Sequence, residues 1–186
     1  SLLETLRNDA CGLSNIEAHL DRLEASARWF AIELDRPAIE RHLAAVEPSP
    51  HAERVRLLLD RHGAFTIEQH PLDVASDPVV LAVDDTITRS DDPYCCHKTT
   101  WRRHYDQART RHPSADDVVL VNELGHAIET TIANLAYRIG ASWYCPPLTD
   151  GGLPGIGRAV AIERGQLAER SIAATDLGRC DELAVI

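Results

Sequence analysis

The stretch VLVNELGHAIETTIANL, residues 119–135, decides the fold expected for this chain. It begins as an apolar strand and continues at 122–125 with the polar and glycine residues of a hairpin turn. A run of apolar and β-branched residues, 127–131, returns from that turn, and short strands are expected again at 135–139 and 142–145. This part of the chain therefore predicts a strand-rich unit built from hairpins.

Glu129 places a carboxyl group inside the returning strand, among apolar and β-branched neighbours. If it is buried, the carboxylate needs a partner, and a protonated pyridine nitrogen is one that would serve. The plainer alternative, in which Glu129 faces solvent on an alternating strand, stays open on the sequence alone.

Further along, the segment TDGGLPG at 149–155 is a glycine-rich loop, and a helix is expected from 156 to about 167. Exposed backbone N–H groups at the start of a helix suit a phosphate. The loop matches neither the Walker nor the Rossmann pattern, so an ordinary turn is an equal alternative.

Upstream of this unit the sequence predicts a smaller α+β unit. A Ser14 and Glu17 capping box begins a helix with apolar residues at 3–4 spacing, and Pro37 suits the first position of a second helix. The expected elements are a strand at 1–8, helices at 14 to about 33 and 37–46, strands at 55–59 and 65–69, and a strand at 79–83.

Polar residues separate the two units. They predict a linker at 85–94 between a small N-terminal α+β domain, 1–84, and a strand-rich domain, 95–186. A helix is expected from 99 to about 111. The last expected strand, 183–186, runs to the final residue, so we expect the second domain to be incomplete at its C-terminus.

Composition narrows the class of protein. The 186 residues carry a net charge of −10, which disfavours nucleic acid as a partner. No apolar run reaches the roughly 18 residues that span a bilayer, and the start lacks the pattern of a signal peptide. Five irregularly spaced cysteines argue against a disulfide framework, and Cys95-Cys96-His97 makes a poor metal site, so we expect no metal and a cytoplasmic location.

Lysine is the unusual residue of this composition. The chain has 18 arginines and a single lysine, Lys98. Arginine can replace lysine where charge suffices but not where a neutral amine must act as a nucleophile. Lys98 is therefore a candidate Schiff-base residue, and the positive field of Arg102 and Arg103 should lower its pKa. A solvated lysine at a helix start is the alternative.

A lysine, a buried carboxylate and a phosphate-binding loop are the parts that a pyridoxal 5′-phosphate (PLP) site requires. In this order they resemble the class IV aminotransferase family, the fold-type IV PLP enzymes. The matching segments are LETLR at 3–7, HLDRL at 19–23 with SA at 26–27, HKTT at 97–100, the stretch 119–135, and LPGIGR at 153–158.

The resemblance implies a role for each matching residue. Lys98 would form the Schiff base, Glu129 would bind the pyridine nitrogen, and Arg22 would contact the phosphate. The backbone amides of Ile156 and Gly157 would cradle the same phosphate. Gly157 stands where the family usually has threonine, and the expected closing segment falls beyond the last residue of this sequence.

The resemblance also implies the architecture. It is an α+β fold of two domains like that of D-amino-acid aminotransferases, with a small N-terminal α/β sandwich and a strand-rich C-terminal pseudo-barrel. The cofactor would lie in the cleft between the domains, and the enzyme would be a homodimer.

The LETLR opening and the KTTxR segment look most like the aminodeoxychorismate lyase branch of the family. This branch implies a PLP-dependent lyase of folate biosynthesis that converts a small amino substrate, 4-amino-4-deoxychorismate, to 4-aminobenzoate and pyruvate. Arg102 and Arg103 would bind the anionic substrate. Two alternatives remain: a class IV aminotransferase acting on D- or branched-chain amino acids, and a cofactor-free, non-catalytic homologue.

Overall fold

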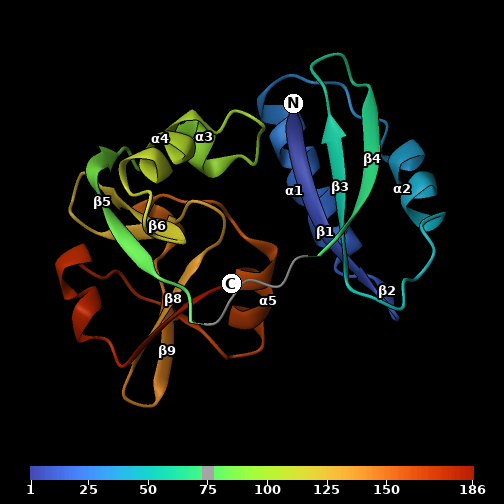
Figure 1. The fold of residues 1–186 in the computed structure, drawn as a ribbon. Helices are drawn as coiled ribbons and strands as arrows, with labels where there is room; N and C mark the ends of the chain where they lie inside the picture. Colours follow the sequence, from blue (N-terminus) through green and yellow to red (C-terminus); the bar gives the residue numbers. More distant parts are fainter. Residues whose placement is uncertain (73–77) are drawn as a thin grey trace. The chain divides into compact units, whose positions relative to one another are not determined.

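The computed structural model describes residues 1–72 and 78–186. In this part of the chain no helix is both long and apolar enough to cross a membrane. Helices and strands gather into two compact units (Figure 1). Unit 1 is Ser1–Ala75 with Lys98–Trp101, and unit 2 is Ser76–His97 with Arg102–Ile186.

Unit 1 is an antiparallel sheet with two helices, and its strand order is β2-β1-β3-β4. β1 pairs with β3 along its whole length, from Leu2 opposite Leu59 to Asn8 opposite Glu53. The elements are β1 (Leu2–Asp9), β2 (Gly12–Leu13), α1 (Ile16–Trp29), α2 (Arg36–Ala44), β3 (Glu53–Leu59) and β4 (Phe65–Pro71).

The core of unit 1 lies between the helices and one face of this sheet. Alternate residues of β1 and β3 point into it, which confirms the half-buried strand predicted at 55–59. The apolar stripe of α1 and two residues of α2 close the core from the other side. Its buried members are Leu2, Leu6, Leu20, Leu23, Ala27, Ile39, Leu43, Val55, Leu57 and Leu59.

The predicted capping box of α1 is wrong. The N-cap is Asn15, in the left-handed region with φ 54°, and among the described residues no side-chain capping bond forms there. Glu17 turns instead to Arg36, with Oε2 and Nη2 2.8 Å apart. α2 follows the prediction more closely, because Pro37 lies in its first turn and Asp35 accepts from the N–H of Ala38.

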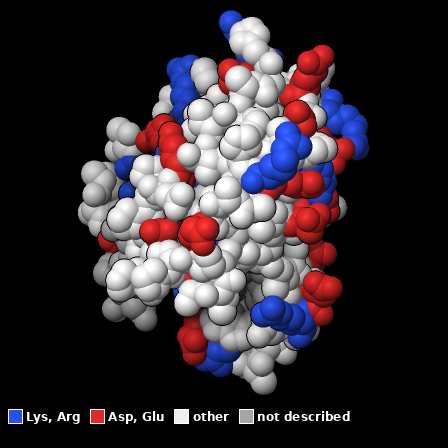
Figure 2. Space-filling view, turned by 90° about the vertical axis from the view of Figure 1, so that its right-hand side faces the viewer, with Lys and Arg blue, Asp and Glu red and all other residues white. Residues whose placement is uncertain are grey.

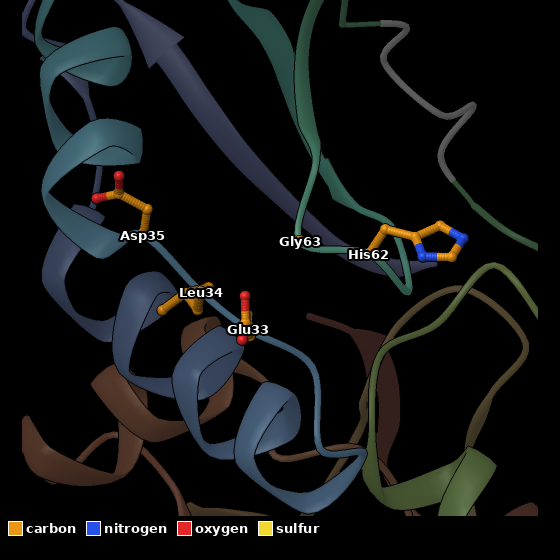
Figure 3. Close-up of a pocket in the computed structure, with 5 residues that line it drawn as sticks. All are labelled: Glu33, Leu34, Asp35, His62 and Gly63. Atoms are coloured by element: carbon orange, nitrogen blue, oxygen red, sulfur yellow. The ribbon is translucent and has the colours of Figure 1, made fainter.

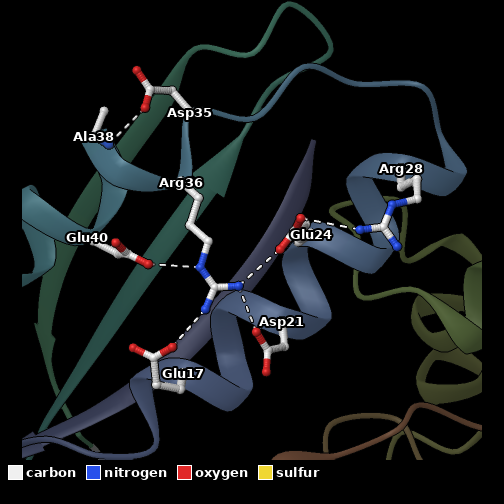
Figure 4. Close-up of polar contacts among 8 residues, drawn as sticks. All are labelled: Glu17, Asp21, Glu24, Arg28, Asp35, Arg36, Ala38 and Glu40. Carbon is white, nitrogen blue, oxygen red and sulfur yellow. Dashed lines mark hydrogen bonds and ion pairs between the residues drawn. The ribbon is translucent and has the colours of Figure 1, made fainter.

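Arg36 ties the two helices of unit 1 together (Figure 4). Its guanidinium contacts Glu17, Asp21 and Glu24 of α1 at 2.7–3.0 Å and Glu40 of α2 at 2.8 Å. Exposed ion pairs are individually weak, but here one cation serves four carboxylates. The arrangement fixes α2 beside α1 at the outer side of the core.

Unit 2 holds two sheets. One has the order β5-β6-β7, with β5 and β6 parallel, and the other has the order β10-β9-β8-β11. The elements are β5 (Leu81–Thr88), α3 (Pro93–Cys96), α4 (Arg103–Arg111), β6 (Asp117–Asn122), β7 (Ala127–Thr130), β8 (Leu135–Ile139), β9 (Ser142–Cys145), η1 (Leu148–Asp150), α5 (Ile156–Glu163), β10 (Ala168–Glu169), η2 (Ala174–Arg179) and β11 (Glu182–Val185).

The hairpin predicted within 119–135 is confirmed. β6 and β7 pair antiparallel with Val121 opposite Ala127, and Gly125 takes a positive φ of 78° in the turn between them. All residues of both strands are buried, so β7 has no solvent-facing side. Glu129 is therefore a buried carboxylate, 3% exposed, and the solvent-facing alternative is wrong.

The strand expected at 79–83 continues to Thr88, and residues 85–88 of the predicted linker belong to β5. The adjacent residues Asp84 and Asp85 indicated an exposed linker, because aspartate is rarely buried. In the structure Asp84 is buried, with the Nε of Arg111 2.8 Å from its Oδ1. The last residues of the same stretch begin α3 at Pro93.

Two further helix predictions differ from the structure. The helix expected at 99–111 begins only at Arg103, and the helix expected to reach about 167 ends at Glu163. Near the C-terminal end of unit 2, His126 and Ala173 form one isolated β-bridge. Such short pairings depend on distant partners, which local propensity does not reveal.

Candidate active site

β1 of unit 1 contains a buried carboxylate, Glu4, which is 2% exposed. His19 and Arg22 lie three residues apart on α1, so both reach it from one helix face. His19 Nδ1 is 2.7 Å from Oε2, and Arg22 bonds both oxygens, with its Nε 2.9 Å from Oε1. Burial raises the pKa of Glu4, but the bonds from His19 and Arg22 outweigh it and hold that pKa below the ordinary value.

Lys98 does not begin a helix, so that prediction is wrong. Its segment is extended along β1: the N–H of Leu3 donates to the Lys98 carbonyl at 2.9 Å, and Thr99 bridges to Leu2. The main chain places the half-buried Lys98 beside Leu3. The next residue of β1, Glu4, binds the Arg22 side chain.

Three donors of unit 2 bond to the Glu129 carboxylate. The Tyr105 hydroxyl donates to Oε1 at 2.6 Å. The N–H of Leu153 donates to Oε2 at 3.0 Å, and the side-chain amide of Asn134 donates to the same oxygen at 3.2 Å. Donors aimed at both oxygens favour the ionised form of a buried carboxylate.

The glycine-rich loop passes so close to Glu129 that larger residues would not fit. Gly152 has φ 102°, and a Cβ there would lie 2.9 Å from the Ile128 side chain. At Gly155 a Cβ would lie only 1.8 Å from Oδ1 of Asn134. These glycines are required by close approach and backbone geometry, which an ordinary surface turn would not need.

The loop leads directly into α5, whose first residues are Ile156 and Gly157. The N-cap, Gly155, has no side chain that could accept from the first amides, and the first bond of the helix is from the Ala159 N–H to the Gly155 carbonyl. The positive end of the helix thus presents backbone donors, which is the arrangement that binds anions.

The turn between β6 and β7 anchors the start of this loop. Asn122 accepts from the N–H groups of Leu124 and His126 and donates to the Asp150 carbonyl at 2.9 Å. The His126 ring lies 3.1 Å from the buried carboxylate of Asp150. The stretch that decides the fold therefore also holds the loop in place.

The two arginines predicted to bind substrate differ in their surroundings. Arg102 donates to the Thr131 carbonyl, and its guanidinium lies 4.7 Å from the centre of the Tyr105 ring. Arg103 is exposed at the first position of α4. A role in substrate binding stays a prediction for both.

The structure therefore groups the predicted residues as two sets. Glu129, Ile156 and Gly157 are connected within unit 2, and Arg22 and Lys98 flank neighbouring residues of β1 in unit 1. Sequence analysis missed the residues that position them, which are Glu4, His19, Tyr105, Asn134 and Asp150. Glu4, His19 and Asn134 stand within the motif segments and were available as signals, whereas Tyr105 and Asp150 lie outside them.

A cavity of about 420 Å³ lies elsewhere in unit 1 (Figure 3). Its lining is mostly polar, and none of the described residues predicted to bind the cofactor belongs to it. The lining residues are Glu33, Leu34, Asp35, His62 and Gly63.

Comparison with known proteins identifies the family of the chain. The family profile described as class IV amino-transferase matches residues 1–186. A Schizosaccharomyces pombe protein provisionally named an aminodeoxychorismate lyase is 30% identical over 176 residues, covering 91% of this chain and 76% of that protein.

Solved structures show the same fold. A Mesorhizobium loti protein provisionally described as an amino-acid aminotransferase matches with TM-score 0.84 at 31% identity, covering 98% of this chain and 91% of its own. The 4-amino-4-deoxychorismate lyase of Pseudomonas aeruginosa matches with TM-score 0.78 at 20% identity, covering 99% and 77%. The second likeness concerns the fold alone.

The fold and the family match together define an α+β enzyme of fold-type IV. The chain belongs to the class IV aminotransferase family, whose members are PLP-dependent aminotransferases and lyases.

Proposed function

We propose that this chain is a PLP-dependent lyase that converts 4-amino-4-deoxychorismate to 4-aminobenzoate and pyruvate. The name of the S. pombe relative, at 30% identity, supports this choice within the family. The structural observation that carries the proposal is the Glu129 carboxylate, buried and bonded through Leu153 to the loop that opens α5.

The donors and acceptors of unit 2 fit PLP. A buried carboxylate that receives three hydrogen bonds is suited to stay ionised against a protonated pyridine nitrogen. The first amides of α5, at Ile156 and Gly157, suit a phosphate. Leu153, between these two features, ties their positions together, as a rigid cofactor requires.

We propose that Arg22 and Lys98 complete the site from unit 1. Glu4, which is itself bonded to His19, holds the Arg22 guanidinium in one orientation. We assign the Arg22 guanidinium to the cofactor phosphate. Lys98 would bind the cofactor aldehyde covalently, because an amine that can lose its proton is the nucleophile required and arginine cannot supply one.

When bound, PLP supplies an aldehyde that condenses with amines and a ring that accepts electrons. We propose that the Lys98 amine, displaced by the substrate amine, takes the proton from ring carbon C4 of the substrate. Glu129 would hold the proton at the pyridine nitrogen during this transfer. The bond from the substrate ring to the enolpyruvyl oxygen would then break, and the ring would become aromatic. The departing enolpyruvate would take the proton from Lys98 at carbon and become pyruvate, and the Lys98 amine would then displace 4-aminobenzoate.

The second candidate is an aminotransferase acting on D- or branched-chain amino acids. The M. loti protein of 31% identity carries an aminotransferase description, which favours this alternative. The two reactions differ in a measurable way, because a transaminase converts its cofactor to the amine form and then needs a keto acid, whereas the lyase needs none.

We further propose a homodimer in the cytoplasm. Several large apolar side chains of unit 2 are more than half exposed, and burying them against a second copy would favour association. Figure 2 shows white, uncharged surface lying between groups of red and blue charged side chains. The residues concerned in unit 2 are Val80, Ile87, Leu124 and Ile132, and light scattering on the purified protein measures the oligomeric state.

The first experiment is an absorbance spectrum after addition of PLP, followed by an assay for 4-aminobenzoate. The lyase should show a band at about 410–420 nm that borohydride abolishes, and it should release 4-aminobenzoate without a keto acid. Turnover that depends on a keto acid would favour the aminotransferase. A protein without the band would be the cofactor-free homologue, and the proposal would fail.

A further inference from the structure

Tyr105 contacts the Glu129 carboxylate from the first turn of α4. Its hydroxyl donates to Oε1 at 2.6 Å, and its side chain is 7% exposed. Leu153 and Asn134 serve the other oxygen, Oε2. The Tyr105 hydroxyl is therefore bonded to a different carboxylate oxygen from the one that Leu153 and Asn134 share.

Tyr105 is suited to donate and not to accept. Burial, and then the negative charge of Glu129, raise the pKa of Tyr105 well above its ordinary value, so the phenol keeps its proton. A hydrogen bond donated to a carboxylate stabilises the charged form relative to the protonated form. Without the hydroxyl, Glu129 would gain affinity for a proton.

Other titratable groups surround the pair. Burial, and then the charge of Glu129, raise the pKa values of the Cys95 and Cys96 thiols of α3. Burial lowers the pKa of His104 on α4. The raised thiol pKa values and the lowered His104 pKa leave these three groups neutral near pH 7. The charge of Asp92 also acts on all three, and the Arg102 guanidinium lies over the Tyr105 ring.

We propose that Tyr105 is a positioning residue that keeps the Glu129 carboxylate ionised and oriented, so that Glu129 can hold the proton on the pyridine nitrogen of PLP. This inference rests on the proposed function, because it takes Glu129 as the partner of the cofactor ring. Tyr105 acts through Glu129 and need not touch the cofactor.

Tyr105→Phe tests the hydroxyl alone. The ring packs in a cluster with Ala108, Val118, Leu120 and Ile128, and phenylalanine fills the same space. Tyr137→Phe is the matched control, because Tyr137 is also buried in unit 2 and donates its hydroxyl at 2.5 Å to the Arg170 carbonyl instead.

The measurement is the pH at which the visible band of the PLP-loaded protein changes to its near-ultraviolet form. The midpoint of this change reports the pKa of the nitrogen that joins Lys98 to the cofactor. A protonated pyridine nitrogen lowers that pKa, so a variant in which the pyridine nitrogen loses its proton should have a higher midpoint. Tyr105→Phe should raise the midpoint by about one pH unit and lower kcat about 10-fold with little change in KM. Tyr137→Phe should leave both unchanged.

A double-mutant cycle separates positioning from general damage. In a Glu129→Gln protein, Tyr105→Phe should add no further shift of the midpoint, since its effect is exerted through the carboxylate. An unshifted midpoint in Tyr105→Phe, an equal shift in Tyr137→Phe, or full additivity in the cycle would each overturn the role of Tyr105. If the unsubstituted protein forms no band with PLP, the proposed function itself fails, and this role with it.

A second readout uses the unsubstituted protein if Tyr105→Phe does not fold. The chain has four tyrosines, so hydroxyl protons can be assigned in protein carrying labelled tyrosine, with Tyr137→Phe as a reference. Loading with PLP should move the Tyr105 hydroxyl resonance and leave that of Tyr137 in place. A Tyr105 resonance that does not respond to PLP would contradict the proposal.

Discussion

Leu153 donates its main-chain N–H to Oε2 of Glu129 at 3.0 Å, so the loop before α5 is bonded directly to the buried carboxylate. Asn134 repeats this link, because its Nδ2 lies 3.2 Å from the same oxygen and 3.0 Å from the Leu153 carbonyl. The position of the carboxylate and the start of α5 are therefore coupled, and the account of cofactor binding depends on that coupling.

Asn134→Ala should weaken PLP binding about 10-fold, because it removes both bonds of the link at a cost of about 1–3 kcal/mol. Titration of the visible band with PLP measures the dissociation constant. Asn8→Ala is the control, since Asn8 is a buried asparagine of unit 1 whose amide also makes two bonds, to Glu47 and Glu53. Equal losses of PLP affinity in both variants would contradict the link.

Gly157→Thr should tighten PLP binding roughly 3- to 10-fold, because the new hydroxyl can donate to the phosphate at the start of α5. The site accepts a side chain: the nearest heavy atom to a Cβ there is the Ile186 carbonyl carbon, 4.0 Å away. Gly157→Val has nearly the same shape without the hydroxyl. The threonine variant should bind PLP more tightly than the valine variant, and equal affinities would refute the explanation.

Glu4→Gln should destabilise the protein near pH 7 by about 3 kcal/mol, since it leaves the Arg22 charge without its buried partner. The pKa of Glu4 is lowered in the folded state, because the His19 and Arg22 bonds outweigh burial, which alone would raise it. The contribution of this carboxylate to the free energy of unfolding is therefore fully present when the pH is above 4.5, the ordinary pKa of Glu. It is lost as the pH falls through the lower pKa of the folded state.

Thermal unfolding at several pH values tests this assignment. The melting temperature of the parent should fall more steeply below pH 4.5 than that of Glu4→Gln. Glu24→Gln, which alters the exposed ion pairs of Glu24 with Arg28 and Arg36, should change stability by less than about 1 kcal/mol. Parallel pH profiles for the parent and Glu4→Gln would argue against the role given to Glu4.

Local pattern predicted the elements whose stability comes from their own periodicity. The α1 stripe, the alternation of β3 and the turn at Gly125 are all confirmed. Predictions failed where a distant partner decides the outcome. Asp84 remains in a strand because Arg111, 27 residues later, pairs with it.

The candidate site divides in the same way. The motif segments contained Arg22 and Glu129, but no spacing rule brings Tyr105 to Glu129 or the Lys98 carbonyl to Leu3, because those contacts depend on how strands and helices pack. The helix expected at Lys98 was wrong because pairing with β1 keeps that segment extended. Contacts between residues far apart in the chain are the part of the fold that a single sequence does not predict.

The most direct test of the central claim is to reduce the PLP-loaded protein with borohydride and locate the modified residue by peptide mass spectrometry. Because the chain has one lysine, the reduced cofactor should appear on the peptide that contains Lys98 and should be absent from Lys98→Arg. A protein that takes up no label, or carries it at another position with Lys98 unmodified, would contradict the account.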